Sequence, residues 1–268
     1  MAERPPHAII TGGSSGIGLA CAQELAKNGF AVTLIARNTQ RLAQAADQIR
    51  AVAPAASIIM ASVDVNDYAK LQQAIADAVA QHGPVQWAIA CAGICEPGKF
   101  LDQPIAEHAA QLQTNTLGTL NFAHLVAPGM IAGEGGHLIL FSSVAGLVGL
   151  YGYASYGASK FAIHGLAEAL MVELAPKICV SLVCPDDTDT PQLAYERARR
   201  PAVTSEIAGH TSQSAEHVAR VTIAGAKAGK FLITMGGRSL LISVLRGILA
   251  PVSRRYHKSI ISRLDAKS

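Results

Sequence analysis

The chain has few charged residues, and neither sign of charge dominates. Charged residues make up 15% of its 268 residues, and 22 Lys and Arg against 19 Asp and Glu give a formal net charge of +3. A protein that binds nucleic acid needs a clustered basic surface to neutralise phosphates. The sequence therefore predicts no nucleic-acid partner, and we expect a small molecule as the ligand.

The cysteines lack the spacing of a metal site or a disulfide framework. The chain has five, which are Cys21, Cys91, Cys95, Cys179 and Cys184. Their number is odd, most lie within apolar runs, and none forms the CxxC pair that zinc sites use. We predict reduced thiols in the core of a protein that faces the cytosol, and no metal.

Long apolar runs are missing too. Half of the residues are apolar, yet no run approaches the roughly 20 apolar residues that a membrane-spanning helix needs. The first apolar strand is expected at His7, which leaves no room before it for the charged and apolar regions of a signal peptide. The sequence therefore favours a cytoplasmic protein over a secreted one.

Short apolar runs alternate with longer segments of helical periodicity. Seven runs have the character of strands: His7–Thr11, Ala31–Arg37, Ser57–Asp64, Val85–Ala90, His137–Ser143, Cys179–Pro185 and Phe231–Met235. Helices are expected to begin after Ser15, near Gln40, after Asn66, near Ile105, near Tyr153 and after Ser214. Because strands separated by helices pair in parallel, we predict an α/β fold, a Rossmann-type doubly wound sheet of about seven parallel strands with helices on both faces.

A glycine-rich loop, Thr11-Gly12-Gly13-Ser14-Ser15-Gly16-Ile17-Gly18, follows the first predicted strand and opens a helix. Glycines in this position let the backbone turn tightly and approach a pyrophosphate, which the helix N-terminus stabilises. The spacing of Gly12 and Gly16 resembles that of the short-chain dehydrogenase/reductase family; a plain strand-to-helix turn is the alternative. The loop residues expected to bind a dinucleotide are Gly12, Ser14, Ser15, Gly16, Ile17 and Gly18.

The end of the second predicted strand indicates which dinucleotide is bound. It reads Ala36-Arg37-Asn38, where an acidic residue would accept hydrogen bonds from the 2′-hydroxyl of the adenosine ribose. Arginine cannot accept them, but its planar charged fork suits a 2′-phosphate. We therefore expect NADPH rather than NADH, with a solvated surface arginine as the alternative.

The family resemblance implies further contacts to the cofactor. Asp64 resembles the family aspartate beside the adenine, and Ala90-Cys91-Ala92-Gly93 resembles the family loop beside the cofactor, although it departs from the usual Asn-Asn-Ala-Gly. The contacts implied by the resemblance come from Asp64, Val65, Ala92, Gly93, Pro185, Thr188 and Thr190, together with Tyr156 and Lys160.

Tyr156 and Lys160 lie four residues apart near the start of a predicted helix, so their side chains share one face. Ser143 ends a predicted strand thirteen residues before Tyr156. A nearby cation stabilises a phenolate, so we expect Lys160 to lower the pKa of Tyr156 from its usual value of about 10. Such a tyrosine is suited to acid/base catalysis.

The resemblance implies the roles of these residues. Tyr156 would give a proton to a ketone oxygen, Ser143 would polarise that oxygen, Lys160 would also bind the nicotinamide ribose, and Asn115 would anchor a water leading to Lys160. Ser142 replaces Ser143 if the register slips by one residue. The alternatives are a chance YxxxK pattern, an ordinary serine at a strand end, and an asparagine that caps or packs a helix.

Two longer stretches, residues 149–170 and 185–191, resemble one group within the family, the 3-ketodihydrosphingosine reductases. The second stretch is Pro-Asp-Asp-Thr-Asp-Thr-Pro, in which Asp186 stands where this group usually has proline. Asp187 and Asp189 either cap the short helix that begins at Pro191 or pair with a substrate ammonium. The resemblance thus implies a long-chain amino ketone as substrate, contacted by Ser143, Asp187 and Asp189.

Residues 237–268 are predicted to extend an NADP-binding domain formed by residues 1–236. Their apolar residues form helical stripes that comprise Leu240, Leu241, Val244, Leu245, Ile248 and Leu249, then Val252, Tyr256, Ile260 and Leu264, beside Arg254, Arg255, Lys258 and Arg263. A basic amphipathic segment can lie in a membrane interface, so we expect peripheral attachment to the cytosolic face of a membrane. Packing on the domain or on a second subunit is the alternative, and the resemblance implies a homo-oligomer.

Three functions remain open from the sequence. The first is NADPH-dependent reduction of 3-ketosphinganine to sphinganine, and the second is reduction of another lipophilic ketone, such as a steroid or a 3-oxoacyl chain. The third is an NADP-binding sensor without turnover, against which the presence of Ser143, Tyr156 and Lys160 argues.

Overall fold

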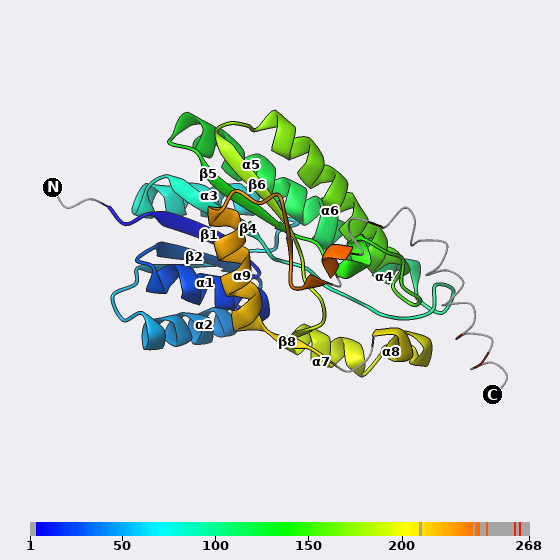
Figure 1. The fold of residues 1–268 in the computed structure, drawn as a ribbon. Coiled ribbons are helices and arrows are strands. Elements are labelled where there is room, and N and C mark those ends of the chain that lie inside the picture. Colours follow the sequence, from blue (N-terminus) through cyan, green and yellow to red (C-terminus); the bar gives the residue numbers. More distant parts are fainter. Residues whose placement is uncertain are drawn as a thin grey trace.

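A computed structural model describes residues 4–208, 211–237 and 239–241, together with Leu245, Ile260 and Arg263. Within these residues, seven parallel strands form a central sheet in the order β3-β2-β1-β4-β5-β6-β9 (Figure 1). They are β1 (His7–Thr11), β2 (Ala31–Ala36), β3 (Ile58–Ser62), β4 (Val85–Ala90), β5 (Gly136–Phe141), β6 (Ile178–Cys184) and β9 (Leu232–Thr234). The predicted doubly wound parallel sheet is confirmed.

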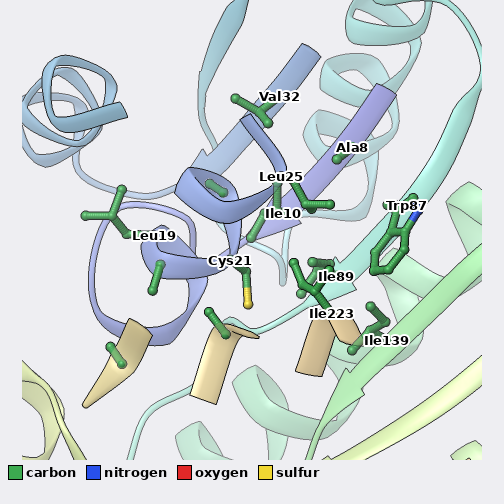
Figure 2. Close-up of a cluster of buried hydrophobic side chains, with 14 of the residues drawn as sticks. Ala8, Ile10, Leu19, Cys21, Leu25, Val32, Trp87, Ile89, Ile139 and Ile223 are labelled. Carbon is green, nitrogen blue, oxygen red and sulfur yellow. The ribbon is translucent and has the colours of Figure 1, made fainter. Parts of the chain in front are cut away.

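Helices cover both faces of this sheet. On one face lie α1 (Gly16–Lys27), α2 (Thr39–Val52) and α9 (Ala215–Lys227); on the other lie α3 (Tyr68–His82), α5 (Gly118–Ala132) and α6 (Ala154–Glu173). Successive strand residues point to opposite faces, so Ala8 and Ile10 pack in one core and Ile9 packs in the other. Figure 2 shows Ile10 and Leu25 in the first of these cores.

Polar residues cap α2 and α9, whereas Ser15 does not cap α1. Asn38 accepts a hydrogen bond from the backbone N–H of Arg41, and Ser214 accepts one from that of His217. Each bond satisfies a backbone donor that the first helical turn leaves unpaired. The helix starts near Gln40 and after Ser214 are thereby explained.

Several strands end earlier than the apolar pattern predicts. Arg37, Asp64, Ser143 and Pro185 lie just beyond β2, β3, β5 and β6. The pattern of apolar residues does not reveal where hydrogen bonding to a neighbouring strand stops, so it misplaces ends by one or two residues. The correction places these four residues in loops at the carboxyl edge of the sheet.

Three features were not predicted. A π-helical turn, Gln113–Leu117, joins α4 (Ile105–Leu112) to α5. A small second sheet pairs β7 (Thr188–Asp189) with β8 (Gln213–Ser214), and a further short helix, α8 (Ala202–Ala208), follows α7 (Pro191–Arg197) (Figure 1). The helix expected to begin at Pro191 is present as α7.

Most of the predicted C-terminal extension lies outside the described residues. Of its predicted stripes, Leu240 and Leu241 are exposed and Ile260 is buried, while Arg263 forms an ion pair with Glu206 of α8. In the described part of the chain, no helix is both long and apolar enough to span a membrane.

The strand order reverses direction between β1 and β4. From β1 the chain builds the sheet outward through β2 and β3, whereas β4 and later strands add on the other side. Open α/β sheets bind ligands in the crevice at the carboxyl ends of the strands that flank such a switch point. The site is therefore expected beyond Thr11 and Ala90.

Candidate active site

A cavity of about 1080 Å³ occupies this position. Its lining comes from the glycine loop after β1, the loops after β2 to β6, and α6 and α7. Residues far apart in the sequence thus share one chamber. This chamber brings the predicted cofactor, catalytic and substrate residues together, with exceptions described below.

The glycine loop approaches the backbone after β4 too closely for a side chain. Gly12 has φ +69°, and a Cβ atom there would lie 2.8 Å from the backbone nitrogen of Ala92. Gly16 has φ +54°, and a Cβ atom there would lie 3.0 Å from Cγ2 of Thr190. Ser15 precedes α1 without a side-chain cap, so no serine oxygen covers the first backbone N–H groups of the helix. The loop therefore forms a cradle of backbone donors, which is the form of a phosphate site.

Two arginines line the cavity beyond this loop. Arg37 follows β2, and Arg41 lies one helical turn later in α2; both are exposed. Arg41 was not expected from the sequence, although it lies four residues after Arg37 and in the first turn of the helix that Asn38 caps. Both guanidinium groups thus add positive charge to the wall of the cavity.

The residues after β3 also line the cavity. Asp64 accepts a hydrogen bond of 2.9 Å from the backbone N–H of Asn66, which fixes its carboxylate. Val65 is buried, and a Cβ atom on Gly118 would collide with its side chain. These contacts hold Asp64 and Val65 in place in the wall of the cavity.

The loop after β4 is held by side chains from other elements. Thr11 Oγ1 accepts from the backbone N–H groups of Cys91 at 3.2 Å and Ala92 at 3.3 Å. Gly93 lies beside the side chains of Asn115 and Lys160, where a Cβ atom would lie 3.6 Å from Lys160 Nζ. Cys91 lines the cavity, and burial raises the pKa of its thiol to about 12, so it stays protonated.

Tyr156 and Ser143 meet in the middle of the cavity. Tyr156 is buried on α6, and its phenol is hydrogen-bonded to Ser143, whose Oγ also accepts from the backbone N–H of Ala145 at 3.1 Å. Ser142 instead donates to the backbone carbonyl of Lys160 at 2.9 Å. The register with Ser143 beside Tyr156 is therefore the one that the structure has.

Burial, and not Lys160, dominates the acidity of Tyr156. Desolvation raises the pKa of Tyr156 well above its ordinary value, and the hydrogen bond to Ser143 opposes this only in part. The predicted lowering by Lys160 is wrong for this geometry, because Lys160 Nζ lies 5.6 Å from the ring centroid and donates to the Phe141 carbonyl at 3.0 Å. Burial also lowers the pKa of Lys160. Tyr156 therefore holds its proton at neutral pH, as a general acid must.

Asn115 lies in the π-helical turn and is fully buried. Its Oδ1 accepts from the backbone N–H of Ile94 at 2.8 Å, and its Nδ2 donates to the Ile94 carbonyl and to Ser159 Oγ, both at 2.9 Å. It thus ties the loop after β4 to α6. The water that the resemblance implies beside Asn115 stays a prediction.

The loop after β6 places both of its threonines in the cavity wall and leaves Asp189 outside it. Thr190 Oγ1 caps α7 by accepting from the backbone N–H of Leu193, and Pro185, Thr188 and Thr190 line the cavity. Asp189 is not part of the lining, because neighbouring residues of β7 point to opposite sides and Thr188 takes the buried side. The structure does not bring Asp189 into the site.

Asp187 lines the cavity, but its carboxylate is bound within the protein. Arg200 donates to it twice, at 3.0 Å and 3.2 Å, and the Arg200 side chain is only 4% exposed. Beside this pair lies Glu196, a buried carboxylate of α7 that also lines the cavity. Sequence analysis named neither Glu196 nor Arg200; their i, i+4 spacing was the only signal.

Comparisons with known proteins agree with this geometry. The family model described as short chain dehydrogenase matches residues 6–201. A 3-ketodihydrosphingosine reductase of Bos taurus is 37% identical over 252 residues, which cover 92% of this chain and 76% of that protein; a 3-dehydrosphinganine reductase of Danio rerio is 36% identical with the same coverage. A solved short-chain dehydrogenase/reductase of Burkholderia phymatum in complex with NAD is 26% identical, with a TM-score of 0.81 over 92% of this chain and 94% of that chain.

Proposed function

The chain belongs to the short-chain dehydrogenase/reductase family, and on that premise we propose that it reduces 3-ketodihydrosphingosine to sphinganine with NADPH, a step of sphingolipid biosynthesis. The proposal depends on one observation. A continuous cavity joins a backbone cradle for a dinucleotide to a buried, protonated phenol. The names of the similar animal proteins support the choice of ketone.

The cavity fits a nicotinamide dinucleotide at its glycine end. The close approach of Gly12 to Ala92 leaves room for a pyrophosphate and not for a side chain. Arg37 and Arg41 favour NADPH, since a 2′-phosphate would lie between two cations. When bound, NADPH supplies the hydride that reduces the ketone carbon.

The side chains of the protein handle the ketone oxygen and its proton. Ser143 donates a hydrogen bond to this oxygen, and Tyr156 gives up its phenolic proton to it as negative charge develops there. Lys160 Nζ lies 5.6 Å from the Tyr156 ring centroid and, as the family resemblance implies, would bind the nicotinamide ribose. Asn115 keeps Gly93 and Lys160 in register through its bonds to Ile94 and Ser159.

The other end of the cavity fits an alkyl chain. Apolar side chains of Val144, Val148, Leu150, Leu193 and Ile207 contribute to its wall. A substrate with such a chain partitions into membranes, so peripheral attachment through residues 237–268 of the extension, beside a domain of residues 1–236, stays part of the proposal. The proposal also includes that the protein forms a homo-oligomer.

The test is a steady-state assay of the purified chain with vesicles present and absent. Candidate ketones are 3-ketodihydrosphingosine, a steroid ketone and a 3-oxoacyl thioester, each with NADPH and with NADH. We expect the highest kcat/KM for 3-ketodihydrosphingosine with NADPH. NADPH oxidation at the background rate with 3-ketodihydrosphingosine would overturn the proposal, and a far higher kcat/KM for another ketone would replace the substrate.

A further inference from the structure

Glu196 is a buried carboxylate on the wall of the cavity. Its side chain is 10% exposed. Its Oε1 accepts from Gln192 Nε2 at 2.9 Å, and its Oε2 accepts from the Tyr153 hydroxyl at 3.1 Å. A carboxylate offers about four acceptor positions, so these neutral donors leave room for a further donor from the cavity.

The buried cation beside Glu196 binds Asp187 more closely than it binds Glu196. Arg200 is the most deeply buried cation of this cluster, and it directs two hydrogen bonds to Asp187 while its Nη2 lies 3.8 Å from Glu196. Arg197 lies 3.8 Å from Asp187 and is more exposed. Two carboxylates thus share one buried guanidinium. A buried charge without a full partner is costly, and a cationic ligand would relieve this cost.

Glu196 also lies next to the reacting centre. Tyr153, which donates to Glu196, packs edge-on against Tyr156 with 5.9 Å between ring centroids. In a 2-amino 3-ketone the nitrogen lies about 2.5 Å from the carbonyl carbon, because only one carbon separates them. The counter-charge for such an ammonium must therefore lie beside Tyr156 and not at the rim of the cavity.

Two other carboxylates of the lining, Asp187 and Glu96, are less suited to bind this ammonium. Asp187 is bound by Arg200. Glu96 accepts a hydrogen bond of 2.6 Å from Tyr195, whose side chain is exposed on the solvent side. Glu196 is the most deeply buried of these three carboxylates, and its charge acts on the Tyr156 phenol.

We propose that Glu196 determines specificity by binding the ammonium of a 2-amino ketone beside the reacting carbonyl. The inference rests on the proposed function and adds to it the reason why an amino ketone is preferred over a plain ketone. It also replaces Asp187 and Asp189 as the ammonium contact expected from the sequence.

The test compares 3-ketodihydrosphingosine with its analogue that lacks the amino group, in the wild type and in Glu196→Gln. We expect the ratio of kcat/KM for the amino ketone over the deaminated ketone to fall about 10- to 100-fold in Glu196→Gln, as the loss of a charge-assisted hydrogen bond predicts. Glu96→Gln is the matched control and should change this ratio less than about threefold. An unchanged ratio in Glu196→Gln, or a larger fall in Glu96→Gln, would overturn the inference.

A second measurement uses the wild type, so it does not depend on whether a variant folds. Burial raises the pKa of Glu196 above that of an ordinary glutamate, against the donors Gln192 and Tyr153 and the charge of Arg200. The charge of Asp187 also raises this pKa, and the other titratable or charged groups that face Glu196 are Cys95, Tyr156 and Lys160. As the pH falls through this raised pKa, the carboxylate gains a proton and the kcat/KM ratio should fall.

This fall in kcat/KM at low pH, the acid limb of the pH profile, should occur only with the amino ketone. A deaminated ketone that shows the same limb would assign it to another group and contradict the inference. A wild type that reduces neither ketone would instead contradict the proposed function, so the two failures are distinguishable.

Discussion

The two ends of the cavity are formed by different kinds of chemical groups. At the nucleotide end, backbone groups of the glycine loop form the cradle, and the cations Arg37 and Arg41 are exposed. At the substrate end, Lys160, Glu196 and Arg200 are buried charged side chains held by hydrogen bonds. Exposed charges are screened by water, whereas buried charges act strongly and are costly when left unpaired. Substitutions at the substrate end should therefore affect chemistry and stability more.

The largest effect should come from Tyr156→Phe. Removing the hydroxyl removes the proton donor, so we expect kcat/KM to fall by about 10²- to 10⁴-fold. NADPH binding and the Tm should change little, because Phe fills the same space. Tyr68→Phe is the control, since Tyr68 is exposed and its hydroxyl bonds to His124 away from the cavity. If Tyr156→Phe retained its activity, the expectation that substitutions at the substrate end affect the chemistry more would be contradicted.

Asp187→Asn tests the buried pair with Arg200. Removing the Asp187 charge leaves the buried Arg200 with Glu196, 3.8 Å away, as its remaining carboxylate, so the free energy of unfolding should fall by about 3 kcal/mol. Asp47→Asn is the matched control, because Asp47 pairs with Arg50 at the surface and its side chain is 77% exposed. That variant should lose less than about 1 kcal/mol in the same urea titration. Equal losses would show that burial does not matter here.

Gly12→Ala tests the backbone cradle. The substitution adds a Cβ atom that overlaps the Ala92 backbone, at a positive φ that alanine adopts only with strain. Gly29→Ala is the control, because Gly29 has φ +82° but no neighbouring atom within 4 Å of an added Cβ. We expect Gly12→Ala to cost about 1–3 kcal/mol more than Gly29→Ala in unfolding experiments, and to weaken NADPH binding. Equal losses of unfolding free energy in the two variants would mean that the loop shifts to accommodate the added Cβ atom.

The smallest effect should come from the exposed cations. Arg37→Ala and Arg41→Ala should each reduce the preference for NADPH over NADH by about tenfold, the value of one hydrogen bond between charged groups. Their Tm should not change. Arg50→Ala, on the same helix as Arg41 but not in the cavity lining, serves as the control. An unchanged preference in both variants would place phosphate recognition elsewhere.

The sequence by itself determined the sheet, the cofactor loop and the Tyr156–Lys160 pair. Each depends on local information: alternation of apolar residues, a cap such as Ser214, a run of glycines, or an i, i+4 spacing. The strand-end residues Arg37 and Ser143 were identified for the same reason, although the ends of their strands were not.

Only the tertiary structure decided which charged groups face the substrate. Asp187, Glu196 and Arg200 come from a segment without strong periodicity, and Glu196 and Arg200 are hydrogen-bonded to Tyr153, which precedes α6. Likewise, the acidity of Tyr156 follows from its desolvation and not from its spacing to Lys160. Burial is a property of the assembled chain, and burial sets both the cost of a charge and its strength, so neighbours in sequence cannot reveal it.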